Sequence, residues 1–181
     1  MALGNRDGPS WTPAGEGRVV GIGGTLDRTT IDRYAAGART PRTWIAGLNP
    51  ADLNATPIPG KWSVQQLVLH VLDSDLIASH RMKRIIAEDV PLLISYDETR
   101  FAASLFYEKM DIALACELFD LNRRQTTDIL RLLPAAAFER TGIHNQRGKM
   151  TLTDVVQSYI KHLDHHAPFA LEKRKALGKP L

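Results

Sequence analysis

The sequence of 181 residues predicts an all-α protein, a four-helix bundle that follows a glycine-rich N-terminal arm. Four stretches have apolar residues at helical spacing, and start and stop signals flank them. Residues 1–26 hold seven of the thirteen glycines. We find no pattern that indicates a strand and no internal repeat. The expected parts are an arm at 1–28, a bundle at 29–177 and a tail at 178–181.

The first helix is expected over residues 29–48, in two parts. Gly37 lies in the middle of this stretch, and glycine weakens the interior of a helix. Thr40 and Pro41 follow, and proline suits the first turn of a helix because its missing N–H has no helical partner there. We therefore expect a break near Gly37 and a restart at Thr40.

The second helix is expected from Ser63 to about residue 88. Ser63 and Gln66 have the S-x-x-Q spacing of a capping box, in which each side chain accepts a hydrogen bond from the backbone N–H of the other residue. Residues 89–100 follow without helical periodicity and are predicted to form a loop.

The third and fourth helices are expected at residues 107–133 and 151–177. Pro134 ends the third, because proline cannot continue a helix. Thr151 and Asp154 form a second start signal before the fourth. Four amphipathic helices of this length predict a bundle whose helices run up, down, down and up, or in a similar order.

The charge distribution argues against a nucleic-acid partner. Residues 172–181 carry a net charge of +3, which equals the formal net charge of the whole chain. A nucleic-acid-binding protein instead presents a concentrated basic face on its folded body. No apolar run approaches the roughly 20 residues that span a bilayer, so no membrane partner is expected either. A small-molecule substrate is the expected partner, and a homodimer remains open.

Cysteine usage and the N-terminal residues predict a cytoplasmic protein. The chain has one cysteine, Cys116, so it forms no internal disulfide, and a reducing compartment is the default. The first residues, MALGNRDGPSW, lack the apolar core of a signal peptide. Cys116 has no basic neighbour in the sequence that would lower its pKa, so it is not expected to act as a nucleophile.

Three of the six histidines lie within the stretch HLDHH, residues 162–166. On a wheel of about 100° per residue, His166 lies in the apolar arc of the fourth helix, His162 at its border and His165 outside it. His162 and His166 therefore form an i, i+4 pair that can hold one metal ion. His70, on the flank of the second helix's apolar face, is the candidate third ligand. From spacing alone, a metal site and ordinary packed histidines both remain open.

Two acidic residues fall on apolar faces. Asp75 does so on the second helix and Asp111 on the third. A buried acid needs a partner, and Arg123 or Arg124 can supply one from the third helix. We expect a structural ion pair between helices.

The sequence indicates groups for proton transfer less clearly than metal ligands, and it offers one candidate catalytic residue. His144, in the loop before the fourth helix, is that candidate, with an ordinary surface position as the alternative. Asp73 follows His70 by three positions and is either a partner of that ring or, more simply, an acid on the helix surface.

Three segments resemble segments of the DinB family, and they occur in the same order as in that family. PGKWSVQQLVLHVLDSD resembles its second-helix signature, RTGIHNQRGKMTL the loop before its last helix, and YIKHLDHH its closing helix. The resemblance covers roughly residues 30–172 and implies a DinB-like four-helix bundle with a divalent metal bound by His70, His162 and His166. It is unspecific for substrate, because the family includes metal-dependent hydrolases and thiol-dependent S-transferases. The glycine-rich arm departs from the family pattern.

The helical-wheel assignment and the family resemblance together lead to one hypothesis about function, with one alternative. The chain is expected to be a metal-dependent enzyme, a hydrolase or a thiol-dependent S-transferase, with zinc or nickel at the three histidines. Thiol transfer would use an external low-molecular-weight thiol as co-substrate. The alternative is a non-catalytic or stress-related bundle whose metal is structural or sensed. Four protein ligands would favour the structural alternative, and an open position would favour chemistry.

Overall fold

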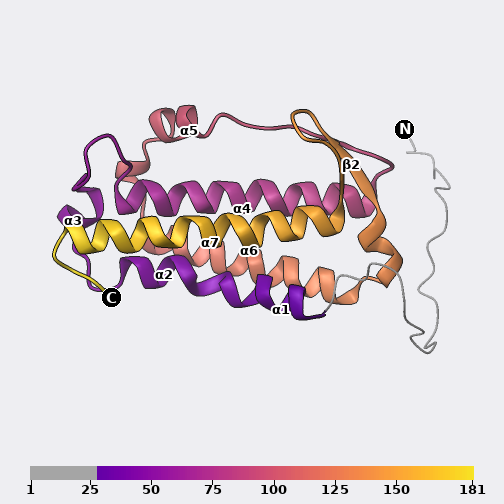
Figure 1. The fold of residues 1–181 in the computed structure, drawn as a ribbon, viewed down its shortest axis with the longest axis horizontal. Coiled ribbons are helices and arrows are strands. Elements are labelled where there is room, and N and C mark those ends of the chain that lie inside the picture. The colour runs from indigo at the N-terminus through magenta and orange to yellow at the C-terminus, as the bar shows by residue number, and fades with distance from the viewer. Residues whose placement is uncertain (1–27) are drawn as a thin grey trace, which may run out of the picture.

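The computed structural model describes residues 28–181, so the predicted arm, apart from its last residue, lies outside the described residues. Four helical units lie side by side along the longest axis (Figure 1). They are α1 (Arg28–Ala36) continued by α2 (Thr40–Ile45), α4 (Val64–Ala87), α6 (Ile112–Leu132) and α7 (Leu152–Ala176). Within residues 28–181, no helix has the length and apolarity needed to cross a membrane.

Short elements join these units. Near the first helical unit are η1 (Gly37–Arg39) and α3 (Pro50–Asn54). Between α4 and α6 lie β1 (Leu92–Leu93), α5 (Glu98–Ser104) and η2 (Tyr107–Lys109). Between α6 and α7 lie η3 (Ala135–Glu139), β2 (Thr141–His144) and β3 (Gly148–Thr151).

The helices run in the expected up-down-down-up order. The segment between α4 and α6 returns along the bundle, so α4 and α6 run in the same direction, while α1 and α7 run in the opposite one (Figure 1). The pairing of β1 with β2 agrees with this order, since β1 follows the end of α4 and β2 follows the end of α6. The four-helix bundle predicted from the sequence is therefore correct.

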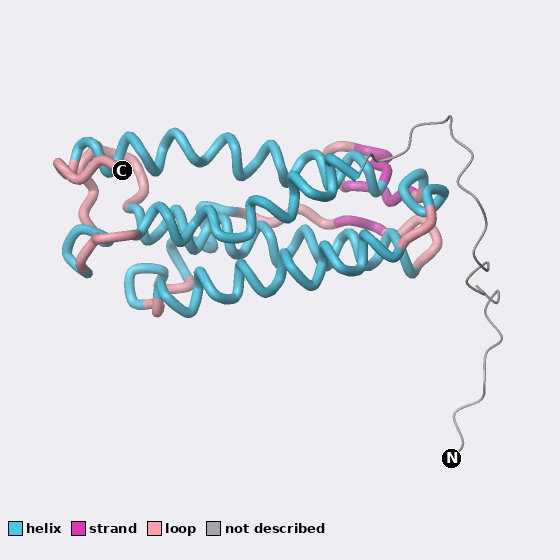
Figure 2. Tube along the Cα trace, turned by 90° about the horizontal axis from the view of Figure 1, so that it is seen from below, coloured by secondary structure: helices cyan, strands magenta, loops and turns pink. Residues whose placement is uncertain are grey.

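A three-stranded sheet of order β1-β2-β3 lies against the bundle towards one end (Figure 2). β1 pairs with β2 in parallel, and β2 pairs with β3 as an antiparallel hairpin. The expectation of no strands was therefore wrong, and residues 89–100 are not a simple loop, because they include β1 and the start of α5. Strands this short carry no alternating pattern, and they form because distant segments meet.

The helix starts agree with the capping signals in two cases. Ser63 and Gln66 form both hydrogen bonds of a capping box before α4, and Thr151 and Asp154 do the same before α7. The break at Gly37 and the restart at Thr40 are also confirmed.

The third helix is shorter than expected. Asp111 does not lie on an apolar face but is the exposed N-cap of α6, where its carboxylate accepts hydrogen bonds from the backbone N–H groups of Ala113 and Leu114. The capping oxygen replaces partners that the first N–H groups of a helix lack. The expectation of a buried Asp111 was therefore wrong, because a cap was mistaken for a position on the helix face.

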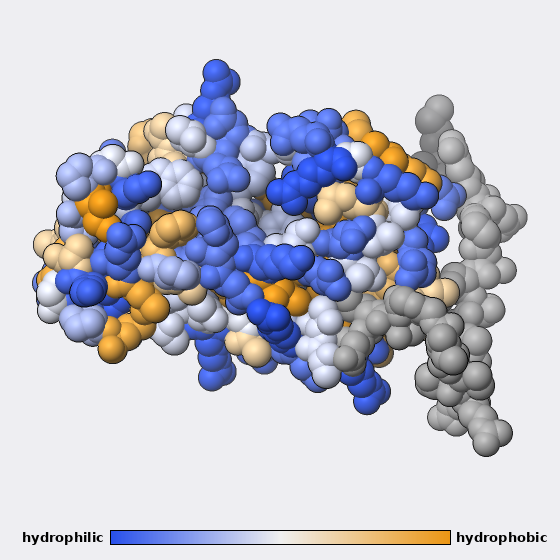
Figure 3. Space-filling view, viewed as in Figure 1, coloured by the Kyte–Doolittle hydropathy of each residue, from blue (hydrophilic) through white to orange (hydrophobic). Residues whose placement is uncertain are grey.

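Two apolar clusters fill the bundle, one towards the sheet and one towards α3. The first includes Tyr34, Met82 and Leu152, and the second includes Trp44, Leu72 and Phe119. Hydrophilic side chains cover most of the face seen in Figure 3. The three histidines described next lie on α4 and α7, which pack against each other.

Candidate metal centre

The three histidines singled out from the sequence converge. The Nε2 atom of His70 lies 3.2 Å from that of His162 and 3.1 Å from that of His166. The two Nε2 atoms on α7 are 3.1 Å apart. His70 is 1% exposed, while His162 and His166 are partly buried. Among residues 28–181, these three form the one group of His, Cys, Asp and Glu side chains close enough to share a metal ion.

Helix geometry brings the rings together. His70 lies on the buried side of α4, and its ring packs 4.9 Å from that of Trp62. His162 and His166 are one turn apart on α7, with ring centroids 4.5 Å apart. His165 is exposed, and its nearest ring partners are His166 and Phe169. The face assignment made on the helical wheel is therefore correct.

Burial keeps all three rings in the neutral form. It lowers the pKa of His70 to about 4 and the pKa of His166 to about 4. The pKa of His162 falls to about 3, chiefly through burial and further through the two neighbouring imidazoles. A metal ligand must present an unprotonated nitrogen, so this burial prepares the rings for coordination near neutral pH.

The spacing of the nitrogens fits a divalent ion. Three imidazoles at about 2.0–2.1 Å from a tetrahedral ion have nitrogens about 3.3–3.4 Å apart, close to the separations in this cluster. Without a cation, a neutral Nε2–H can donate to one neighbour at a time, which leaves lone pairs facing one another. A shared cation removes that repulsion, so the donor set suits a divalent transition-metal ion.

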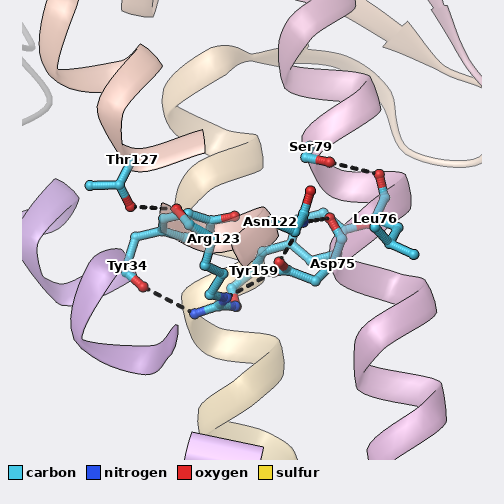
Figure 4. Close-up of polar contacts among 8 residues, drawn as sticks. All are labelled: Tyr34, Asp75, Leu76, Ser79, Asn122, Arg123, Thr127 and Tyr159. Atoms are coloured by element: carbon cyan, nitrogen blue, oxygen red, sulfur yellow. Dashed lines mark hydrogen bonds and ion pairs between the residues drawn. The ribbon is translucent and has the colours of Figure 1, made fainter. Parts of the chain in front are cut away.

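A buried ion pair holds the helices that carry the histidines (Figure 4). Arg123 on α6 donates from Nε to Oδ1 of Asp75 on α4 at 2.8 Å, and the two side chains are 2% and 1% exposed. Asn122 donates to the other carboxylate oxygen at 2.8 Å. Arg123 also donates to the backbone oxygens of Tyr34 on α1 and Tyr159 on α7. The predicted interhelical pair thus forms with Arg123, and Arg124 is exposed.

A cleft of about 130 Å³ opens beside the cluster, between α4, α7 and the segments that carry β1 to β3. His162 is the member of the cluster that lines it. Its walls are mostly polar, and they include Ser74, Arg81, Tyr96, Glu98, His144 and Tyr159. The cleft therefore reaches the cluster at His162.

His144 lies at this cleft, in β2, and is 7% exposed. Burial lowers its pKa, and the charges of Arg81 and Arg147 lower it further. Its Nδ1 accepts a hydrogen bond from the backbone N–H of Gln146 at 3.2 Å, which leaves Nε2 as the donor of the neutral ring. The surface alternative is therefore wrong, and the ring is arranged as a hydrogen-bond donor.

Sequence reasoning missed Glu98. Its carboxylate Oε2 lies 3.8 Å from the Nε2 atom of His70, and it lines the cleft from the first turn of α5. Its side chain is half exposed, at 53%. No motif marks it, because it begins a seven-residue helix within a segment predicted to be a loop. The N-cap spacing of Asp97 was the one local signal that a helix starts there.

Two other candidates have structural positions. Cys116 is buried in the second apolar cluster, and burial raises its pKa to about 11, so the chain offers no thiolate here. Asp73 accepts a short hydrogen bond from the hydroxyl of Tyr107 and so ties η2 to α4. Neither of its expected roles, a surface acid or a partner of the His70 ring, matches this contact.

Comparisons with solved structures agree with this fold. The Bacillus subtilis protein YfiT, described as "a probable metal-dependent hydrolase with an unusual four-helix bundle topology", superposes with a TM-score of 0.80 and 22% identity. The match covers 92% of this chain and 97% of that one. A mycothiol-dependent maleylpyruvate isomerase gives a TM-score of 0.62 at 12% identity, over 78% of this chain and 59% of that one. At these identities, both likenesses establish the fold alone.

Sequence comparisons identify relatives and a family. A protein of Bacillus licheniformis named "Putative metal-dependent hydrolase" is 29% identical over 138 residues, 76% of this chain and 78% of that protein. A protein of the same name from Bacillus pumilus is 29% identical over 155 residues, 81% of this chain and 88% of that protein. The family model of the DinB superfamily matches residues 34–169. This chain, a four-helix bundle with three converging histidines, therefore belongs to the DinB superfamily.

Proposed function

We propose that this protein is a metal-dependent hydrolase of small molecules, with a divalent ion, zinc or nickel, held by His70, His162 and His166. The observation that carries the proposal is the convergence of three neutral imidazole nitrogens beside an open, polar cleft. The names of the curated relatives support the same reaction class. Three protein ligands leave a position for water or substrate, as catalytic rather than structural sites do.

The ion would supply Lewis acidity, which lowers the pKa of water and polarises a carbonyl group. The residues of the chain supply position and proton transfer. Glu98 is the carboxylate nearest to the cluster, and its Oε2 is placed to accept the proton of an attacking water. The Nε2–H of His144 is available to donate a hydrogen bond to substrate in the same cleft.

Glu98 distinguishes this proposal from its alternatives. If its carboxylate takes up a proton, the metal remains bound by the histidines when Glu98 is replaced. If it instead closes the site as a fourth protein ligand, the metal is structural and its affinity depends on Glu98. Thiol transfer requires an external thiol, because Cys116 is buried and protonated.

The test is hydrolysis of ester and amide panels by the zinc-loaded or nickel-loaded protein, together with Glu98→Gln. We expect Glu98→Gln to lower kcat by about 10²–10⁴-fold while the metal content measured by elemental analysis stays unchanged. The matched control is Glu108→Gln, an exposed acid in the same connecting segment that does not line the cleft. It should hydrolyse at the wild-type rate.

Three results would overturn hydrolysis. Loss of the metal in Glu98→Gln would indicate a closed structural site. Turnover only in the presence of a low-molecular-weight thiol and an electrophile would identify an S-transferase. A metal-loaded wild-type protein that turns over no substrate of either panel would support the non-catalytic alternative.

A further inference from the structure

Arg81 is a buried cation on the wall of the cleft. It is 8% exposed, and it lines the cleft beside His162. No carboxylate of residues 28–181 forms an ion pair with it, although Arg123, in the core of the bundle, has Asp75. A buried charge without a counter-charge costs free energy, so such groups usually have a partner.

Most of the hydrogen-bonding capacity of Arg81 is unused. Its Nη1 donates to the hydroxyl of Tyr159 at 2.7 Å, and its Nη2 donates to the backbone oxygen of Ile94. Its Nε is buried without a partner in the described part of the chain. A guanidinium has five N–H groups in a fixed plane, so several remain for another acceptor. The two bonds fix its orientation, which prepares it for a planar or tetrahedral oxyanion.

The rest of the cleft adds to this arrangement. Arg147, from the turn between β2 and β3, lines the same cleft and brings a second positive charge. His144 contributes the Nε2–H donor described above, and Ser95 and Ser158 also line the wall. Glu98 is the one acid among the lining residues, and it lies on the side of His70.

We propose that Arg81 holds an oxyanion group, a carboxylate or a phosphate, of the small molecule that enters the cleft. The substrate of the site is then an anionic small molecule whose reacting group lies towards His162. Tyr159 lies between Arg81 and the metal cluster. Its hydroxyl accepts a hydrogen bond from Arg81, and the centroid of its ring lies 6.0 Å from that of the His162 ring. A cleft of about 130 Å³ suits a small acid rather than a polymer. The claim that the substrate is anionic rests on the proposed function. The claim that Arg81 binds an oxyanion does not depend on it.

The test measures binding of propionate, inorganic phosphate and neutral propionamide to the full chain, both metal-stripped and zinc-loaded. Titration is followed by the side-chain ¹⁵N–H resonance of Arg81 Nε and by calorimetry. We expect propionate or phosphate to shift that resonance and to bind about tenfold or more tightly than propionamide, including in the metal-stripped protein. The tighter of the two anions identifies which oxyanion the site takes.

Arg81→Gln should weaken anion binding by about tenfold or more. Arg84→Gln is the matched control, because Arg84 also lies on α4 and also donates to a backbone oxygen of the following segment, that of Leu92, but does not line the cleft. It should bind the anions as wild type does. If Arg81→Gln does not fold, the resonance of Arg81 in the wild-type protein decides the question.

The inference is wrong if neither anion shifts the Arg81 resonance, or if a folded Arg81→Gln binds both anions as wild type does. These failures differ from failure of the proposed function. An active, metal-loaded enzyme that binds no anion at Arg81 overturns this inference alone. A protein that binds anions at Arg81 but holds no metal overturns the proposed hydrolysis and, with it, the substrate class.

Discussion

Gly37 shows how one residue can connect the start of the chain to the middle of the bundle. A Cβ atom at this position would lie 2.7 Å from Cδ2 of Leu163, on α7, and closer still to Nη1 of Arg123, on α6. The sequence predicted a helix break at Gly37, because glycine weakens the interior of a helix. The structure gives a second reason for a glycine at this position, which is that a buried guanidinium leaves no room for a Cβ atom.

Replacing this glycine tests the packing argument. Helix propensity alone predicts that Gly37→Ala stabilises the protein by about 0.5–1 kcal/mol. The contact with Arg123 and Leu163 predicts the opposite sign, a loss of about 1–3 kcal/mol from overpacking. Urea unfolding followed by circular dichroism measures the change. A gain in stability would show that the neighbours move aside without cost.

The buried histidines predict a pH dependence for the metal-free protein. Burial lowers the pKa of His70 to about 4, while the same residue in the unfolded chain keeps a pKa of about 6.5. Between these values the unfolded state binds a proton that the folded state does not, so the free energy of unfolding decreases as the pH falls from about 6.5 to 4. Each such histidine contributes at most about 1.4 kcal/mol per pH unit.

Chemical denaturation of the metal-stripped protein at several pH values measures this dependence. The variant His70→Gln, which removes one titrating group, should have a shallower slope between pH 6.5 and 4. A slope equal to that of wild type would mean that His70 does not titrate differently in the folded and unfolded states.

At the level of single residues, the sequence predicted the metal candidates better than the groups around them. His162, His165 and His166 follow helical periodicity, so their faces could be assigned from their spacing alone. Glu98 could not be found in this way, because its position beside the cluster depends on a connecting segment that folds back along the bundle, and no local pattern encodes that path. Arg81 lies on α4 with His70, but the same connecting segment forms part of the cleft that Arg81 lines.

At the level of elements, α4 and α7 must keep a fixed relation for the three rings to meet. Asp75 lies five residues after His70 on α4, and the backbone oxygen of Tyr159 lies one turn before His162 on α7. Arg123 contacts both, which joins the two histidine-bearing helices through α6 (Figure 4). The ion pair is therefore a structural support of the site.

Removing one partner of this pair should be costly. Arg123→Leu leaves Asp75 buried without its counter-charge, and we expect a loss of about 3–5 kcal/mol in the free energy of unfolding. The double variant Asp75→Leu, Arg123→Leu should recover part of that loss, because no unpaired charge remains. Denaturant unfolding of both proteins gives the comparison. Equal stability of the single and double variants would contradict the assignment of the loss to an unpaired carboxylate.

The boundaries of the elements show which parts of the fold could be predicted from the sequence and which could not. Capping boxes before α4 and α7 marked those helix starts to the residue, since both partners are local. The start of α6 was placed five residues early, because η2 and the cap at Asp111 continue an apparently helical pattern. β1 has two residues and depends on pairing with β2, which lies beyond α6 in the chain, so its own sequence could not reveal it.

At the level of the whole molecule, the bundle supplies stability and the connecting segments supply the surroundings of the site. Both apolar clusters lie among residues of the helices, β1 and nearby short turns. The segments that line the cleft, including β1 to β3 and the start of α5, lie against one side of this core.

The central claim is that His70, His162 and His166 bind one divalent ion, and metal stoichiometry tests it most directly. Elemental analysis of the purified full chain, after loading with zinc or nickel and desalting, is compared with His162→Ala and His165→Ala. The account predicts about one ion per chain in wild type and in His165→Ala, whose ring is exposed and is not part of the cluster, and loss of the ion in His162→Ala. Equal metal content in the two variants, whether retained or lost in both, would contradict it.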